Sequence, residues 1–226
     1  MILLDDRWRL ALGNSLVVGI CATAISVVLG SMAAYGLTQG NFKLKRVVAV
    51  VLVSPIMVPI VVKALAMYFA LTRIGLIGTH LGLIIAHALL AMPVVIVPVY
   101  ATLQGFDRSL IRAAQSLGAT PVSTFFRVVL PIVLPGVASG AVFAFATSFD
   151  EVVIATFVSS PQQMTLPRML YSGLRDQLTP AVAAVAATSL LFSLGFLLSV
   201  DRLRRRAARM AAAGDESALQ SRAPAC

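Results

Sequence analysis

Three charged side chains lie where the sequence is otherwise apolar, and they are the first candidates for chemistry. Asp150 and Glu151 are adjacent in the stretch SFDEVVIATFV, and Lys63 lies in a run of aliphatic residues. A carboxylate at membrane depth costs roughly 2.5–3.5 kcal/mol, so such residues normally face a bundle interior or water. The acids could line a pathway for a cationic solute such as a polyamine. Alternatively, Lys63 could neutralise one of them, or could extend to the interface while the acids lie just outside the lipid.

The two histidines suggest a second kind of chemistry. His80 and His87 could join the acids in a proton relay, although a single histidine near a membrane interface is more often hydrogen-bonded within the packing. No group of His, Cys, Asp and Glu has metal-ligand spacing, and Cys21 and Cys226 do not form a disulfide framework. We therefore expect no metal site.

Sequence motifs of soluble enzymes are absent. The sequence contains no GxxxxGK[ST] loop for nucleotide phosphates, no nucleophile elbow and no HExxH pair. We expect that this chain is not an enzyme on its own and binds no cofactor itself.

The elements that must position these side chains follow first from composition. Of the 226 residues, 59% are hydrophobic and 12% are charged, and the mean hydropathy is +0.93. Soluble domains have about 45–50% apolar and about 25% charged residues. The composition excludes a water-soluble globule and a disordered chain. It predicts an integral membrane protein.

Five stretches are long and apolar enough to cross a bilayer as helices, which takes about 20 residues. They cover about residues 11–37, 47–71, 81–103, 128–157 and 180–200. The fold class is therefore an all-α membrane protein, with one membrane domain over 7–202 and a basic tail over 203–226. Proline pairs interrupt the second, third and fourth stretches: Pro55 and Pro59, Pro93 and Pro98, Pro131 and Pro135. Such breaks occur where transporter helices line a pathway, but membrane helices also tolerate proline without that role.

The distribution of positive charge predicts the orientation. Most of the 18 Lys and Arg residues fall in alternate loops, around 43–46, 108–127 and 202–222. Since Lys and Arg are retained in the cytoplasm, these segments and the C-terminus are expected inside, and the N-terminus outside. An external N-terminus so close to Arg7 and Arg9 indicates that an earlier span precedes Met1, or that the short tail is translocated. The net charge of +9 needs no nucleic-acid partner.

The predicted cytoplasmic loop at about 104–127 contains a short amphipathic helix. Asp107 or Ser109 can cap its start, and Gly118 can end it in a left-handed conformation. A second short helix is expected from about Thr120. The apolar face of the first helix consists of Leu110, Ala113, Ala114 and Leu117. Such a face could lie on lipid headgroups or bind in a groove of a partner protein.

The spacing in and after this helix resembles the EAA loop of ABC importer permeases. That motif reads E-A-A, three residues, G, nine residues, I-x-L-P. The matching residues are Ala113, Ala114, Gly118, Leu130 and Pro131, with Val128 for the isoleucine. Arg112 replaces the acid. The resemblance implies that 107–127 is a coupling helix that docks on a separate cytoplasmic ATPase.

Further segments resemble the spermidine/putrescine-type branch of these permeases. They are Gly13-Asn14-Ser15-Leu16, Leu134-Pro135-Gly136, Ser148-Phe149-Asp150-Glu151 and Thr165-Leu166-Pro167. The resemblance implies a five-helix, methionine-importer-like type I core in the bacterial inner membrane. It also implies three partners: an ATPase dimer that hydrolyses ATP, a second permease subunit that is a homologous chain, and a solute-binding protein. An amphipathic helix expected near 167–174 would lie at the interface and contact the binding protein.

Two other functions stay open at this point. A proton-driven secondary transporter would use Asp150, Glu151 and His87, and a membrane scaffold would carry no solute. Neither function requires the spaced loop motif.

Overall fold

The computed structural model describes residues 6–176 together with residues 187 and 195. Within these residues all regular secondary structure is helical. The chain divides into two compact units, Met1–Val185 and Ala186–Cys226, and the helices α1 to α9 all belong to the first. Apart from residues 187 and 195, the predicted fifth span at 180–200 lies outside the described residues, as does the predicted tail at 203–226.

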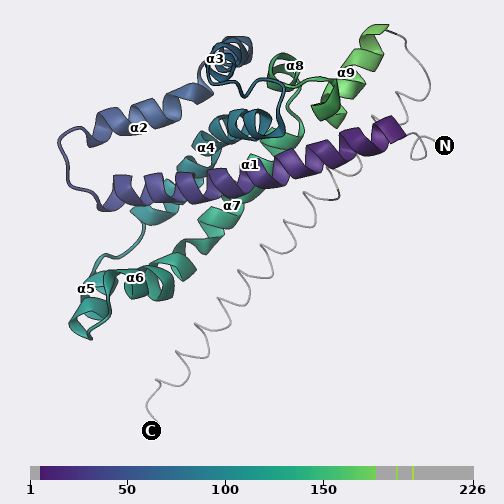
Figure 1. Cartoon of the computed structure of the whole chain (residues 1–226). Coiled ribbons are helices and arrows are strands. Elements are labelled where there is room, and N and C mark those ends of the chain that lie inside the picture. Colours follow the sequence, from purple (N-terminus) through teal and green to yellow (C-terminus); the bar gives the residue numbers. More distant parts are fainter. Residues whose placement is uncertain (1–5, 177–186, 188–194, 196–226) are drawn as a thin grey trace. The chain divides into compact units, whose positions relative to one another are not determined.

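In the described part of the chain, three helical runs are long and apolar enough to cross a membrane (Figure 1). They are α1 (Asp6–Gln39) with 34 residues, α4 (His80–Gln104) with 25, and a continuous run, Pro121–Phe149, with 29. The last consists of α6 (Pro121–Thr124), the π-helical turn η3 (Phe125–Val129) and α7 (Leu130–Phe149). At about 1.5 Å per residue, each run exceeds the roughly 30 Å hydrocarbon core. They correspond to the first, third and fourth predicted spans.

The second predicted span, 47–71, is not one helix. It consists of α2 (Lys45–Val53), the 3₁₀ turn η2 (Ser54–Ile56) and α3 (Ile60–Arg73), and the two halves are bent by 104°. Pro55 and Pro59 bracket the bend, and Pro59 has extended backbone angles (φ −53°, ψ 137°). Neither proline can donate to the preceding turn, so the helical ladder cannot continue through them. The pair forms either a broken span or a re-entrant loop.

The fourth predicted span, 128–157, is not one helix over its whole length. The helical run that contains it starts at Pro121, where the second short helix was expected, and α7 ends at Phe149. A separate short helix, α8 (Val153–Val158), follows the break. The Glu151 carboxylate accepts the N–H of Ile154 at 2.8 Å. This side chain therefore supplies a partner for the start of α8, which lets the backbone leave the α7 helix.

Small residues allow α1, α4 and α7 to pack closely. α1 runs along both α4 and α7 (Figure 1). Gly30 of α1 and Gly140 of α7 both lie against Val95 of α4, where an added Cβ would come within 3.0 Å of Val95 atoms. Helices in lipid associate through such close contact because the bilayer provides no hydrophobic drive between them. Val95 therefore lies where α1, α4 and α7 meet, within one of the buried clusters of the described unit.

Gly136, one turn before Gly140, generates a stability prediction. A Cβ at Gly136 would lie 2.3 Å from Thr102 Oγ1 and 3.0 Å from the Pro98 carbonyl oxygen. Overpacking of this kind costs about 1–3 kcal/mol, so Gly136→Val should lower the thermal unfolding midpoint of the detergent-solubilised protein. Gly36→Val is the matched control, because nothing lies within 4 Å of a Cβ at that position. Equal midpoints for the two variants would contradict the packing described here.

Candidate functional site: the loop between the third and fourth spans

The candidate coupling loop begins with a side-chain cap. The Asp107 carboxylate accepts the N–H of Ser109 at 2.8 Å and the Ser109 hydroxyl at 2.6 Å. These bonds stabilise the ionised form and hold the pKa of Asp107 below its usual value. Ser109 is the first residue of α5 (Ser109–Ser116), so the predicted cap at Asp107 is confirmed.

The end of α5 is a Schellman motif. Gly118 has φ +84°, its N–H donates to the Gln115 carbonyl at 2.9 Å, and the Ala119 N–H donates to the Ala114 carbonyl at 3.0 Å. This pair of bonds satisfies two carbonyls that an unfinished helix leaves free. The left-handed conformation predicted for Gly118 is confirmed, and it requires a residue without Cβ strain.

The second short helix starts where the sequence predicts it. Thr120 Oγ1 accepts the N–H of Ser123 at 3.2 Å, and Pro121 occupies the first turn, where its missing N–H is not needed. The following π turn at Phe125–Val129 was not predicted. Arg127 lies within this turn. Because Pro131 has no N–H to donate to the Arg127 carbonyl four residues earlier, the missing α-helical bond favours the wider π-helical backbone.

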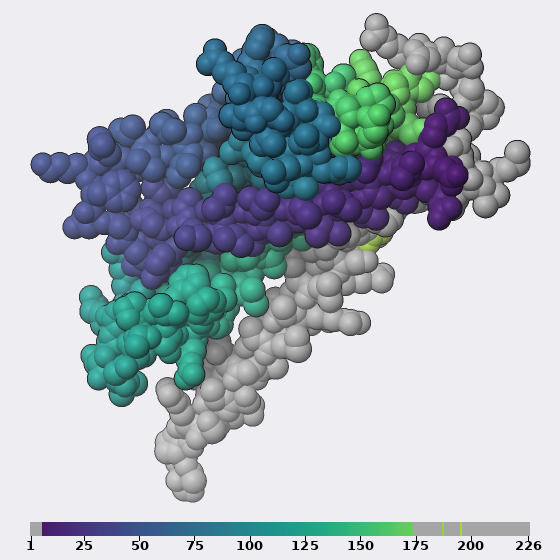
Figure 2. All heavy atoms as spheres, in the orientation of Figure 1, coloured from purple at the N-terminus to yellow at the C-terminus, as the bar shows by residue number. Residues whose placement is uncertain are grey.

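The predicted apolar face of α5 is exposed. Leu110 is 42% exposed and Leu117 is 89% exposed, and Ala113 is exposed as well. In contrast, Ile111 packs against the buried cluster that contains Phe106 and Val129. In Figure 2 the α5–α6 region forms a lobe at one end of the described unit, below α1. One side of α5 therefore attaches to the bundle, and the described helices leave its Leu110 and Leu117 side open.

The remaining loop residues lie on two different elements. Arg112 and Gly118 are exposed on α5 or at its end, and Ala114 is half-buried there. Leu130 and Pro131 lie in the first turn of α7, beyond the π turn. The motif therefore includes both the free helix and the start of the next span.

The charged pathway candidates lie at helix ends rather than within a span. Asp150 is exposed at the end of α7, and Glu151 is half-buried in the break before α8. Lys63 is half-buried in the first turn of α3, which packs against α8. Among the described residues, no salt bridge joins Lys63 to either acid. The ion-pair arrangement is therefore not observed, and Glu151 has a structural role as a cap.

Both histidines are hydrogen-bonded, His87 in the interior and His80 at the surface. His87 is fully buried, and its Nδ1 lies 2.9 Å from Ser148 Oγ and 3.1 Å from the Ser148 carbonyl oxygen. His80 Nε2 lies 3.0 Å from Asn14 Oδ1. Ser148 lies in the last turn of α7, so His87 holds the helix end that precedes Asp150. Within the described residues, no three His, Cys, Asp or Glu side chains gather as a metal site.

Sequence reasoning missed the role of Asn14 and Ser15. The Asn14 amide donates to the carbonyls of Gln162 and Met164, both at 3.0 Å. Ser15 Oγ accepts the N–H of Leu166 at 2.8 Å and so caps α9 (Leu166–Asp176), the amphipathic helix predicted near 167–174. The signal was two adjacent polar residues in an apolar helix, but the sequence does not show which distant backbone they reach.

Comparison with known proteins gives a consistent family. The family model for the binding-protein-dependent transport system inner membrane component matches residues 26–209. The putrescine transport system permease protein PotI of Escherichia coli K12 is 34% identical over 203 residues, covering 87% of this chain and 72% of PotI. The spermidine/putrescine transport system permease protein PotC of the same strain is 31% identical over 204 residues, covering 89% of this chain and 76% of PotC.

Solved structures share the fold. A bacterial ABC transporter that imports the acidic polysaccharide alginate matches with a TM-score of 0.76 at 15% identity, covering 89% of this chain and 76% of that one. The inward-facing MetNI methionine ABC transporter matches with a TM-score of 0.70 at 20% identity, covering 91% and 96%. The predicted type I, methionine-importer-like permease fold is thus confirmed. With a family model matching most of its length and two permeases more than 30% identical to it, this chain belongs to the binding-protein-dependent transport system inner membrane component family, the permeases of ABC importers.

Proposed function

We propose that α5 is the contact through which a separate ATPase drives this permease. The observation that carries the proposal is the exposed Leu110 and Leu117 side of a helix held firmly at both ends. An eight-residue helix is marginal in water on its own, so the Asp107 cap and the Schellman end are what keep its shape. A rigid apolar helix of this kind fits a groove on a partner protein.

The partners and orientation follow from the same proposal. Permeases of this family work with an ATPase, a second permease and a solute-binding protein. ATP would be bound and hydrolysed by the ATPase and not by this chain. The Lys and Arg distribution favours a cytoplasmic α5 and C-terminus, with the N-terminal end of α1 outside.

The transport cycle would then be alternating access driven from α5. Closure of the ATPase dimer on ATP would move α5 as a rigid body, and the chain runs from its two ends to α4 and, through α6 and η3, to α7. The bent pair α2–α3 and the break at 150–152 are the places where the backbone already departs from a straight span. Family membership favours this cycle over a proton-driven carrier or a scaffold.

The solute is proposed to be a polyamine. PotI and PotC are named as putrescine and spermidine/putrescine permeases. Asp150 is exposed where α7 ends and has no salt bridge among the described residues, so its carboxylate is available to a cationic solute. Lys63 and Glu151 remain pathway predictions, with Glu151 also serving as the α8 cap.

The role of α5 can be tested at Gly118. A valine at this positive φ strains the backbone, so Gly118→Val should distort the end of α5 and reduce solute uptake about tenfold or more while the protein stays in the membrane. Gly105→Val is the control, because Gly105 has φ −80° at the other end of the loop. Uptake and ATPase co-purification are measured in parallel, and wild-type values for Gly118→Val would refute the role of α5.

The solute class can be tested at Asp150. Asp150→Asn removes the charge at nearly constant shape, so the initial rate of putrescine uptake should fall several-fold while the affinity of the binding protein for putrescine stays the same. Asp6→Asn is the control, because Asp6 makes only an exposed contact of 3.6 Å with Arg9. Unchanged putrescine uptake in Asp150→Asn would remove the basis for a polyamine.

A further inference from the structure

The last turn of α1 carries a carbonyl that two cations share. The Arg108 guanidinium donates to the Thr38 carbonyl oxygen, and Lys45 Nζ donates to the same oxygen at 3.2 Å. This carbonyl is among the last four of α1, which lack partners within the helix and carry the negative end of its dipole. Arg108 directly precedes α5, and Lys45 is the first residue of α2.

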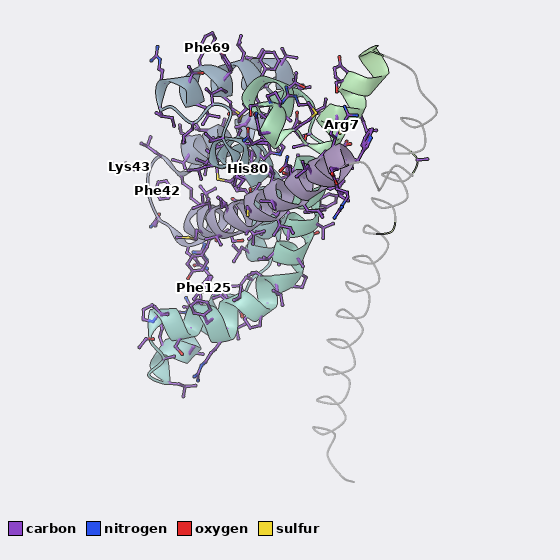
Figure 3. All side chains as sticks on the ribbon, turned by 45° about the vertical axis from the view of Figure 1, so that its right-hand side comes forward. Arg7, Phe42, Lys43, Phe69, His80 and Phe125 are labelled. Atoms are coloured by element: carbon purple, nitrogen blue, oxygen red, sulfur yellow. The ribbon has the colours of Figure 1, made fainter. Side chains whose placement is uncertain are left out.

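The end of the loop that follows α6 contacts the same turn of α1. The Tyr35 and Phe125 rings meet edge to face, with centroids 5.2 Å apart and planes at 78°. Phe125, labelled in Figure 3, is the first residue of the π turn after α6. Ala34, next to Tyr35, lies in the same buried cluster as Phe106, just before α5, and Val129, at the end of η3.

These contacts connect the loop to the two helices, α1 and α2, that do not follow or precede it in the chain. The chain connects α5 directly only to α4 and, through α6, to α7. α1 and α2 are not adjacent to the loop in the sequence, yet they must move with it if the whole bundle is to change state. The Thr38 carbonyl oxygen of α1 accepts hydrogen bonds from the start of the loop and from α2. The Tyr35–Phe125 contact joins α1 to the end of the loop, so that both ends of the loop are attached to α1.

We propose that the last turn of α1, through the Thr38 carbonyl and the Tyr35 ring, receives the movement of α5 and passes it into α1 and α2. Arg108 is then a positioning residue for energy coupling. This inference rests on the proposed contact between α5 and the ATPase. It adds that the amount of solute imported per ATP hydrolysed depends on a contact that touches neither ATP nor solute.

The test uses the complete transporter in proteoliposomes and measures putrescine imported per ATP hydrolysed. Arg108→Leu should lower this ratio about two- to thirtyfold, because residues within a coupling network change coupling by that amount, while ATP hydrolysis stays near wild type. Arg108→Lys keeps a cationic donor and should restore much of the ratio. Arg73→Leu is the matched control, since Arg73 is exposed in the last turn of α3 and lies outside the 107–127 loop, and it should leave the ratio unchanged.

A merely structural role for Arg108 predicts a different result. Loss of folded protein would lower ATP hydrolysis and import in parallel and leave the ratio intact, and that outcome would overturn the proposal. Should Arg108→Leu fail to assemble, Tyr35→Leu tests the second attachment, and an unchanged ratio there would be equally decisive. A crosslink from Leu117→Cys to the ATPase in the wild-type background tests the proposed function separately, because its absence would refute the docking of α5 and not the α1 contact.

Discussion

At membrane depth, every backbone N–H and carbonyl must find a partner inside the protein, and the structure is organised by that constraint. The three long helices satisfy it through their own ladders. Where the backbone leaves a helix, a side chain supplies the missing hydrogen-bond partner. These side chains are Glu151 at the start of α8, His87 at the end of α7, and Arg108 with Lys45 at the end of α1. At these three places, a side chain therefore replaces part of the helical hydrogen bonding.

The described helices differ in how closely they pack, and the irregular breaks in the backbone lie outside the most closely packed region. Gly30 and Gly140 clamp Val95 between α1 and α7, so α1, α4 and α7 form a dense unit. The bend of 104° between α2 and α3 and the break after Phe149 lie outside that contact. In an importer, a stiff unit beside hinged segments suits alternating access, because force applied at one end reaches the hinges with little loss.

The loop between α4 and α7 combines local stiffness with an open surface. Asp107, Gly118 and Thr120 each fix one helix end through a local bond or conformation. Leu110 and Leu117 remain exposed, while Ile111 and Phe125 attach the loop to the bundle. The Asn14 and Ser15 contacts perform a similar attachment for the 160–166 segment, through backbone groups more than a hundred residues away in sequence.

The sequence by itself determined what depends on near neighbours. Composition and apolar length predicted a helical membrane protein and the position of its long spans, and local chemistry predicted the Asp107 cap, the Gly118 turn and the start of α6. Only the tertiary structure decided which distant groups meet. It showed the bend at 54–59, the stop at Phe149, the Ser148 partner of His87 and the two cations on the Thr38 carbonyl. A cap or turn is set within four residues of chain, whereas these contacts depend on how packed helices bring together backbone groups that no local pattern encodes.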